Sequence, residues 1–169
     1  MNKVKRIALD AALTAVALTV FIIELQLPPL IPAIPGIKIG LANVITLVAV
    51  FTLRPGDAAA IQYARILLGC LFAGRMTSLA YSLAGGTLCL IAMLLMRRVL
   101  TDRQAWAASV AGALAHNAGQ LAVAAFVLGT KQIAAVYFPV LAFAGTLAGI
   151  FTGAAGTAAI AAMKKILKR

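Results

Sequence analysis

Long apolar runs alternate along this chain with short polar connections. Six runs have the length and composition of membrane-spanning helices, and they cover residues 7–27, 40–53, 58–72, 76–96, 105–128 and 133–163. About 20 apolar residues suffice for a helix to cross the ~30 Å hydrocarbon core of a bilayer. The second run is shorter than that, which fits a helix whose outer end is replaced by the segment before it.

A proline-rich segment separates the first two runs. Its sequence, LPPLIPAIPGIKIG, is apolar, but Pro28, Pro29, Pro32 and Pro35 forbid a regular helix. We interpret it as a stiff extended or re-entrant cap that the surrounding helices shield from lipid. The sequence therefore predicts an all-α, polytopic membrane protein with six transmembrane helices and a cap after the first. Residues 1–169 are expected to form a single integral membrane domain.

The composition excludes an ordinary soluble domain, because the chain is 63% hydrophobic and only 11% charged. In a soluble protein, the formal net charge of +11 would suggest binding to nucleic acid. Here the basic residues cluster at the ends of apolar runs, where they set topology and contact anionic lipid headgroups. The sparse aromatic residues are not interleaved with these clusters. We therefore expect membrane lipid as a partner and no nucleic acid.

Six spans place both ends of the chain on one side of the membrane. That side carries eleven Lys and Arg residues, whereas the other side carries Lys38, Arg75 and Lys131. Cytoplasmic connections of membrane proteins are enriched in Lys and Arg. The sequence thus predicts a multi-pass protein of the cell (plasma) membrane with both termini in the cytoplasm.

The fifth run, residues 105–128, carries polar residues in its middle. His116 and Gln120 lie four residues apart on one face of the expected helix, between the small residues Gly112 and Ala124, and Asn117 is adjacent. Polar side chains at this depth face protein or a wet cavity, because contact with lipid is costly. The stripe is either a packing face bonded to a neighbouring helix or one wall of a ligand site.

Polar side chains from several other spans fall in the same layer, between the membrane centre and the outer face. We predict that they form an outward-open pocket roofed by the proline-rich cap. The candidate residues give the pocket a net positive charge, since Arg65 and Lys38 outnumber Glu24. We therefore expect a small anionic or strongly hydrogen-bonding ligand. The alternative is that Arg65 and Glu24 are a buried structural pair. The candidate substrate-binding residues are Glu24, Lys38, Asn43, Arg65, Tyr81, Ser82, His116, Asn117 and Gln120.

Small residues at spacings of three or four predict two faces for close helix contact. One lies on the first span and contains Ala8, Ala12 and Ala15. The other is the GxxxGxxxG pattern of the sixth span, which contains Gly145, Gly149 and Gly153. The glycine pattern is compatible with contact to another span or to another subunit.

Four ordered motifs carry a family resemblance, namely PGIKIGLANVITL (35–47), YARILLG (63–69), SLAYSLAGG (78–86) and GALAHNAGQL (112–121). With them the chain resembles the Gx transporter family, which is also labelled heptaprenyl diphosphate synthase component I. The resemblance implies similarity to S components of energy-coupling factor transporters, with six helices, cytoplasmic termini and a pocket near the outer face. It also implies docking of the first helix, through Ala8, Ala12 and Ala15, on a transmembrane coupling protein that works with ATPases. The positions that match the family pattern are Lys38, Gly40, Asn43, Arg65, Tyr81, His116, Asn117 and Gln120.

The synthase label implies chemistry that this chain lacks. Chain-elongating prenyl synthases hold diphosphate through aspartate-rich DDxxD-type motifs and magnesium, whose ligands are carboxylate oxygens. The chain has only four carboxylates, Asp10, Glu24, Asp57 and Asp102, and no two lie within a helical turn of each other. Walker A, GxSxG and HExxH motifs are also absent. We expect no catalytic residue, no metal site and no cofactor, and thus not an enzyme.

Two main functions remain, beside a third possibility, a scaffold whose glycine pattern only mediates assembly and which any saturable ligand would refute. The first is a substrate-binding subunit that takes up a small, cofactor-like molecule and is energised by a partner module. The second is a non-catalytic membrane partner in isoprenoid or quinone metabolism, such as an accessory component of a prenyl diphosphate synthase. A solute binder requires a pocket sealed from lipid, whereas a prenyl binder requires a lateral groove that opens to lipid.

Overall fold

The structure is a computed structural model, and it describes residues 2–27, 40–74, 76–130 and 132–167. Within these ranges the chain is all helical, as predicted. The proline-rich cap expected at 28–39 lies outside the described residues. The helices are α1 (Lys3–Gln26), α2 (Asn43–Thr52), α3 (Pro55–Phe72), α4 (Thr77–Met96), α5 (Ala105–Val127) and α6 (Gln132–Leu167), with a 3-10 turn η1 (Asp102–Gln104) before α5.

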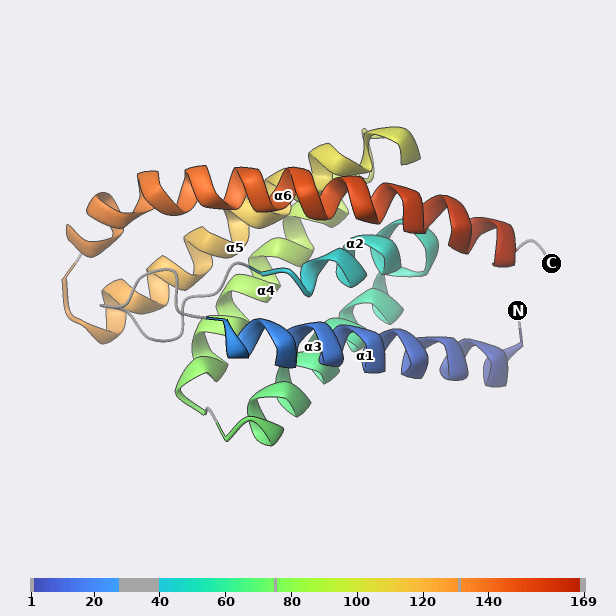
Figure 1. Cartoon of the computed structure of the whole chain (residues 1–169), viewed down its shortest axis with the longest axis horizontal. Helices are drawn as coiled ribbons and strands as arrows, with labels where there is room; N and C mark the ends of the chain where they lie inside the picture. Colours follow the sequence, from blue (N-terminus) through green and yellow to red (C-terminus); the bar gives the residue numbers. More distant parts are fainter. Residues whose placement is uncertain (1, 28–39, 75, 131, 168–169) are drawn as a thin grey trace.

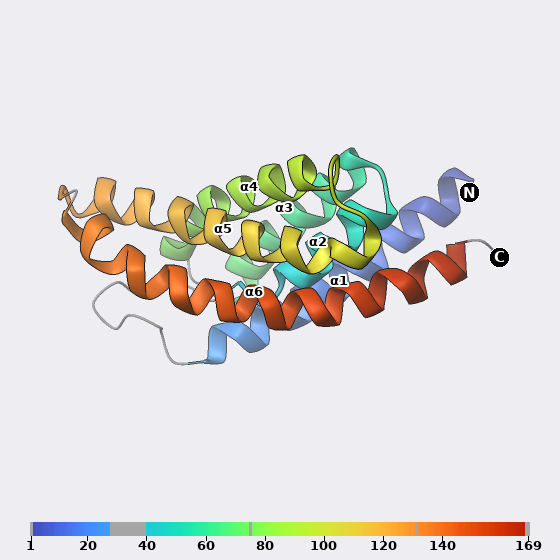
Figure 2. The same ribbon diagram turned by 90° about the horizontal axis from the view of Figure 1, so that it is seen from above.

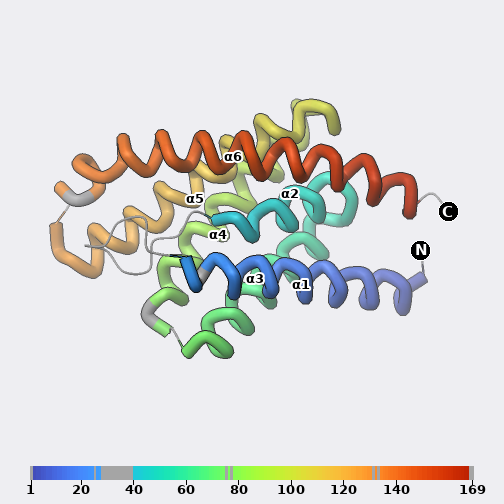
Figure 3. Tube along the Cα trace, viewed as in Figure 1, coloured from blue at the N-terminus to red at the C-terminus, as the bar shows by residue number. Residues whose placement is uncertain are grey.

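Four of the helices, α1, α4, α5 and α6, are long and apolar enough to cross a membrane. This confirms the helical membrane-protein class. Helix α2 has only 10 residues, or about 15 Å, so it reaches through roughly half of a bilayer. Helix α6 has 36 residues, or about 54 Å, and continues through Pro139 without a break. Figure 3 shows that α6 runs along the whole length of the bundle.

The helices run alternately up and down the bundle, so that the start of α1 and the end of α6 lie at the same end (Figures 1 and 2). We call this the termini end. The connections from α2 to α3 and from α4 to α5 also lie there. Among the described residues, every Lys and Arg except Arg65 therefore gathers at this end: Lys3, Lys5, Arg6, Arg54, Arg97, Arg98, Arg103, Lys164 and Lys165.

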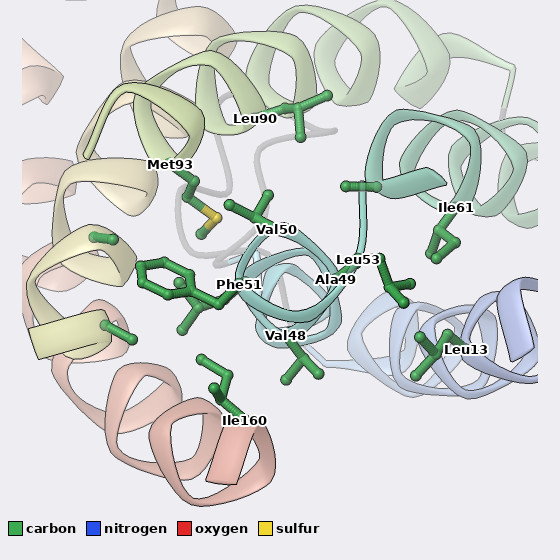
Figure 4. Close-up of a cluster of buried hydrophobic side chains, with 14 of the residues drawn as sticks. Leu13, Val48, Ala49, Val50, Phe51, Leu53, Ile61, Leu90, Met93 and Ile160 are labelled. Carbon is green, nitrogen blue, oxygen red and sulfur yellow. The ribbon is translucent and has the colours of Figure 1, made fainter. Parts of the chain in front are cut away.

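Helix α2 occupies the centre of the bundle, which explains why it is hydrophobic on all sides. Every residue from 46 to 51 is buried. Figure 4 looks along α2 and shows its side chains meeting Leu13 of α1, Met93 of α4 and Ile160 of α6. Because lipid tails are as apolar as these side chains, close packing rather than the hydrophobic effect holds this core together.

The glycine pattern of α6 packs on α5 of the same chain. Gly145, Gly149 and Gly153 are all buried. A Cβ atom added at Gly149 would lie 2.7 Å from the Cα atom of Val110, far inside van der Waals contact. Only glycine permits this approach of the two backbones. Of the two partners left open by the sequence, the structure therefore shows contact with another span.

The small residues of α1 are on its outer surface. Ala8, Ala12 and Ala15 are exposed, whereas Phe21 on the opposite face is buried against α3. There, a Cβ atom on Gly69 would lie 2.3 Å from the Phe21 ring, so glycine makes room for the aromatic side chain. The exposed face of α1 is accessible to a partner helix, and its docking role remains a prediction.

Candidate functional site

A buried arginine organises the polar interior. Arg65, in the middle of α3, is only 3% exposed. Its Nη2 atom donates hydrogen bonds to Gln62 Oε1 at 2.7 Å and to Asn43 Oδ1 at 3.2 Å. Thr46 Oγ1 donates to the same Gln62 oxygen. These side chains tie the first half of α2 to α3, and they keep a guanidinium group in the membrane interior by satisfying part of its donor capacity.

Glu24 supplies the opposite charge near this arginine. Its carboxylate is buried and accepts a hydrogen bond from the backbone amide of Gly40. The Arg65 guanidinium also lies over the Phe21 ring, with Cζ 5.5 Å from the ring centroid, which is within cation–π distance. Among the described residues, no direct ion pair joins Glu24 to Arg65. The two charges attract each other without contact.

Both charged groups line one small cavity. Four helices and the residues before α2 contribute to its wall. The cavity leaves about 10 Å³ for the centre of a water-sized molecule, which is room for about one water. Between the described side chains there is thus no space for a molecule larger than water. Its described lining residues are Phe21, Glu24, Gly40, Arg65, Ile66, Ser82 and His116.

Glycines bring His116 to the cavity. Gly40 has φ of +84°, a backbone conformation that L side chains rarely adopt, and a Cβ atom there would lie 3.4 Å from His116 Cδ2. Gly85 of α4 approaches the same imidazole, because a Cβ atom there would lie 3.0 Å from His116 Cε1 and 3.0 Å from Gln120 Cγ. His116 and Gln120, the two polar residues of the stripe on α5, therefore face α4 and the cavity region.

The structure separates the nine candidate residues into groups. Four line the cavity, namely Glu24, Arg65, Ser82 and His116. Asn43 bonds to Arg65 from α2, and Gln120 is buried one turn beyond His116. Lys38 lies outside the described residues.

Two candidates, Tyr81 and Asn117, are not among the residues that line the cavity. Tyr81 is buried in an apolar cluster with Leu121, Ala124 and Leu141. Asn117 donates from Nδ2 to the backbone carbonyl of Leu141 in α6 at 2.7 Å, so it joins α5 to α6. Both residues therefore hold helices together, whereas Ser82 and His116, which precede or follow them in the sequence, line the cavity.

Sequence reasoning missed several residues of this region. Gln62 and Thr46 belong to the Arg65 network, and the spacing of three between Gln62 and Arg65 was the signal that could have found Gln62. Phe21 and Ile66 line the cavity, but as apolar residues in apolar helices they give no signal. Within the described ranges no group of His, Cys, Asp and Glu side chains could hold a metal ion.

Comparison with known proteins gives one match. The family model described as heptaprenyl diphosphate synthase component I matches residues 13–159. No curated protein and no solved structure matches the chain. The family match includes all residues that line the cavity and all those of the Arg65 network. The chain therefore belongs to the heptaprenyl diphosphate synthase component I family.

Proposed function

We propose that this chain is the membrane-embedded, substrate-binding subunit of an uptake system for a small polar molecule. The observation that carries this proposal is the pair of opposite charges, Glu24 and Arg65, that line one cavity without forming an ion pair. Burying charges inside a membrane protein is costly, and such charges mark ligand or ion sites by default. Ser82 and His116 add hydrogen-bonding groups to the same wall.

The polar groups define the chemistry of the ligand. Arg65 lines the cavity, and its Nε atom is buried and has no hydrogen-bond partner among the described residues, so it offers a donor to an anionic or carbonyl oxygen. Glu24 offers an acceptor to a ligand N–H or O–H group. The best fit is a small ligand that is anionic or that carries an acceptor and a donor together.

The ligand must open the cavity in order to bind. Sites for small molecules commonly have volumes of about 300–1,000 Å³, which is far above the space seen between Arg65 and Glu24. The helices around the cavity therefore have to separate, which fits a subunit that alternates between closed and open states. Because the cavity lies away from the termini end, substrate would enter from the side opposite the chain's basic clusters.

The basic clusters give the orientation. Under the positive-inside rule the termini end faces the cytoplasm of a plasma-membrane protein, and the cavity lies in the outer half. Energy would come from a coupling protein and ATPases that dock on the exposed face of α1 containing Ala8, Ala12 and Ala15, as in the S components that the sequence resembles.

A second function is favoured by the family description and by one surface feature. A lateral, mostly apolar groove of about 480 Å³ lies between α5 and α6. It is lined by Trp106, Ile150, Ala154, Thr157, Ala158 and Ala161. A groove of this kind suits a prenyl chain, so the second candidate is a non-catalytic membrane partner of a prenyl diphosphate synthase. The chain's four scattered carboxylates are unable to supply the aspartate-rich site of such a synthase.

Native mass spectrometry of gently purified protein tests the first proposal. We expect a co-purifying small polar molecule on the wild type, and its loss from Arg65→Lys, which keeps the charge but not the planar fork of donors. Arg103→Lys, the same change at an exposed position of η1, is the matched control and should retain the molecule. Equal occupancy in all three proteins would refute the pocket. A pull-down that recovers a prenyl synthase instead of a coupling protein would favour the second function.

A further inference from the structure

A second groove lies at the termini end, between the start of α3 and the last turn of α4. Its volume is about 580 Å³, and it is separate from the cavity that contains Arg65. Its lining residues are Pro55, Ile91, Leu94, Leu95, Arg97 and Arg98. No acidic side chain is among these described lining residues.

The groove has two chemically different parts. Ile91, Leu94 and Leu95 form an apolar wall on α4, and Ile91 and Leu95 are 47% and 50% exposed on the side of the bundle. Arg97 and Arg98 follow directly at the end of α4, where an interfacial headgroup would lie. An apolar wall that ends in two cations is complementary to an amphiphile with an anionic head.

Arg97 is held in position by the fold. Its Nη1 atom donates a 3.0 Å hydrogen bond to the backbone carbonyl of Leu53, the residue that ends α2. This bond uses one of the five N–H donors of a guanidinium group. A cation fixed in this way loses less conformational freedom when it binds a phosphate than a freely moving side chain does.

We propose that this groove binds an anionic phospholipid of the surrounding membrane. Its phosphate group contacts Arg97 and Arg98, and one acyl chain lies along Ile91, Leu94 and Leu95. The other basic groove at the termini end is less suitable, because it contains Asp57, which is paired with Arg6. That carboxylate already neutralises one of its cations and repels an anion.

The experiment is a lipid titration of the purified protein in neutral detergent, read by native mass spectrometry. The probes are phosphatidylglycerol and phosphatidylcholine with identical acyl chains. We expect the first phosphatidylglycerol to bind at least about tenfold more tightly than phosphatidylcholine. The Arg97→Gln/Arg98→Gln variant should lose this preference, and Arg103→Gln, a charge removal at an exposed site of the same end, should keep it.

Two further variants keep the test independent of the Leu53 bond. Arg98→Gln leaves Arg97 in place and should weaken phosphatidylglycerol binding about threefold or more. Leu95→Trp fills the groove and should weaken binding of both lipids. Equal affinities for the two lipids, or an equal loss in Arg103→Gln, would overturn the proposal. Displacement of bound phosphatidylglycerol by an equimolar amount of farnesyl diphosphate would also overturn it and assign the groove to a prenyl diphosphate.

Discussion

The Asn117 side chain crosses from α5 to α6 and donates a 2.7 Å hydrogen bond to the backbone carbonyl of Leu141. The Asn117 amide group lies in the space beside Gly145 of α6 that a larger side chain at this position would fill. A Cβ atom on Gly145 would lie 2.4 Å from Asn117 Nδ2. The first glycine of the GxxxGxxxG pattern thus serves a hydrogen bond between helices as well as close backbone packing.

This relationship predicts strong coupling between positions 117 and 145. Asn117→Ala should lower the free energy of unfolding by about 0.5–2 kcal/mol, the range for hydrogen bonds between membrane helices. Gly145→Ala should cost about 1–3 kcal/mol, because the new methyl group displaces the Asn117 amide. The double variant should cost less than the sum by about 1 kcal/mol or more, since alanine at 117 makes room for alanine at 145. Unfolding in mixed micelles, followed by circular dichroism, measures all three values.

Ligand binding distinguishes this structural role of Asn117 from a role in the pocket. With the Leu141 bond as its function, Asn117→Ala should keep most of its affinity for the molecule that Arg65→Lys loses. Additive stabilities together with abolished binding in Asn117→Ala would instead place Asn117 in the ligand site.

A second prediction concerns the crossing of α4 and α5 beside the cavity. A Cβ atom on Gly119 would lie 2.7 Å from the carbonyl oxygen of Ala84 and 2.9 Å from the Cα atom of Gly85. Backbone atoms of a packed helix are unable to yield as a side chain does, so Gly119→Ala should destabilise the protein by about 3 kcal/mol. Gly56→Ala is the control, because nothing lies within 4 Å of a Cβ atom there. It should be neutral or slightly stabilising. A wild-type melting temperature for Gly119→Ala would contradict this packing.

A third prediction compares two ion pairs of the described residues, Lys164–Asp102 and Arg6–Asp57. Lys164 Nζ lies only 2.6 Å from Asp102, but both side chains are well exposed, so Asp102→Asn should cost less than about 1 kcal/mol. Asp57 is 3.4 Å from Arg6, and its side chain is only 10% exposed, in the first turn of α3, where a negative charge is favourable. Asp57→Asn should therefore cost more, about 1–2 kcal/mol. Unfolding free energies measured at low and high salt check that Asp57→Asn costs more than Asp102→Asn, and raising the salt concentration should not reverse this ranking. A larger cost for Asp102→Asn would show that the shorter N···O distance matters more than burial.

Much of the fold could be predicted from the sequence, because the length of each apolar run and the polar, glycine or proline residues that end it are local properties of the chain. Residues 105–128 and 76–96 were predicted as helices, and α5 and α4 match these ranges within one residue. The starts of helices were harder to predict. Helix α1 begins at Lys3 instead of residue 7, because Asn2 accepts a hydrogen bond from the Lys5 amide and the basic residues join the helix.

The second and third helices show the same difficulty. Helix α2 begins at Asn43 rather than at residue 40, since Gly40 adopts a positive φ that a helix excludes. Helix α3 begins at Pro55 instead of residue 58, because proline is well suited to the first helical position. An apolar run shows which part of the chain crosses the bilayer. The residue at which the helix begins, however, depends on the backbone conformation of one or two residues.

The sequence could predict at which level along the bundle the polar residues lie, but not which neighbour each side chain faces. Alternating helices set the level of each polar residue along the bundle, so the sequence placed Glu24, Arg65 and His116 in one layer, and in the structure all three line one cavity. A helix turns by about 100° per residue, however, so that adjacent residues face different neighbours. His116 faces the cavity, whereas Asn117 faces α6. Which of two adjacent polar residues faces the cavity depends on tertiary packing, and a single sequence does not contain that information in readable form.

The last prediction tests whether the charges of the cavity depend on each other. Glu24→Gln leaves Arg65 buried without the attraction of a nearby carboxylate, and Arg65→Gln leaves the carboxylate without a nearby cation, so each should cost about 1–3 kcal/mol of unfolding free energy. Glu24→Gln/Arg65→Gln removes both charges and should cost at least about 1 kcal/mol less than the sum of the single changes. Pairing Glu24→Gln with Arg103→Gln gives the control cycle, which should be additive because Arg103 is exposed in η1. Additive effects of Glu24→Gln and Arg65→Gln would mean that the two groups stabilise the fold independently. That result would contradict the proposal that the two opposite charges act together in one site.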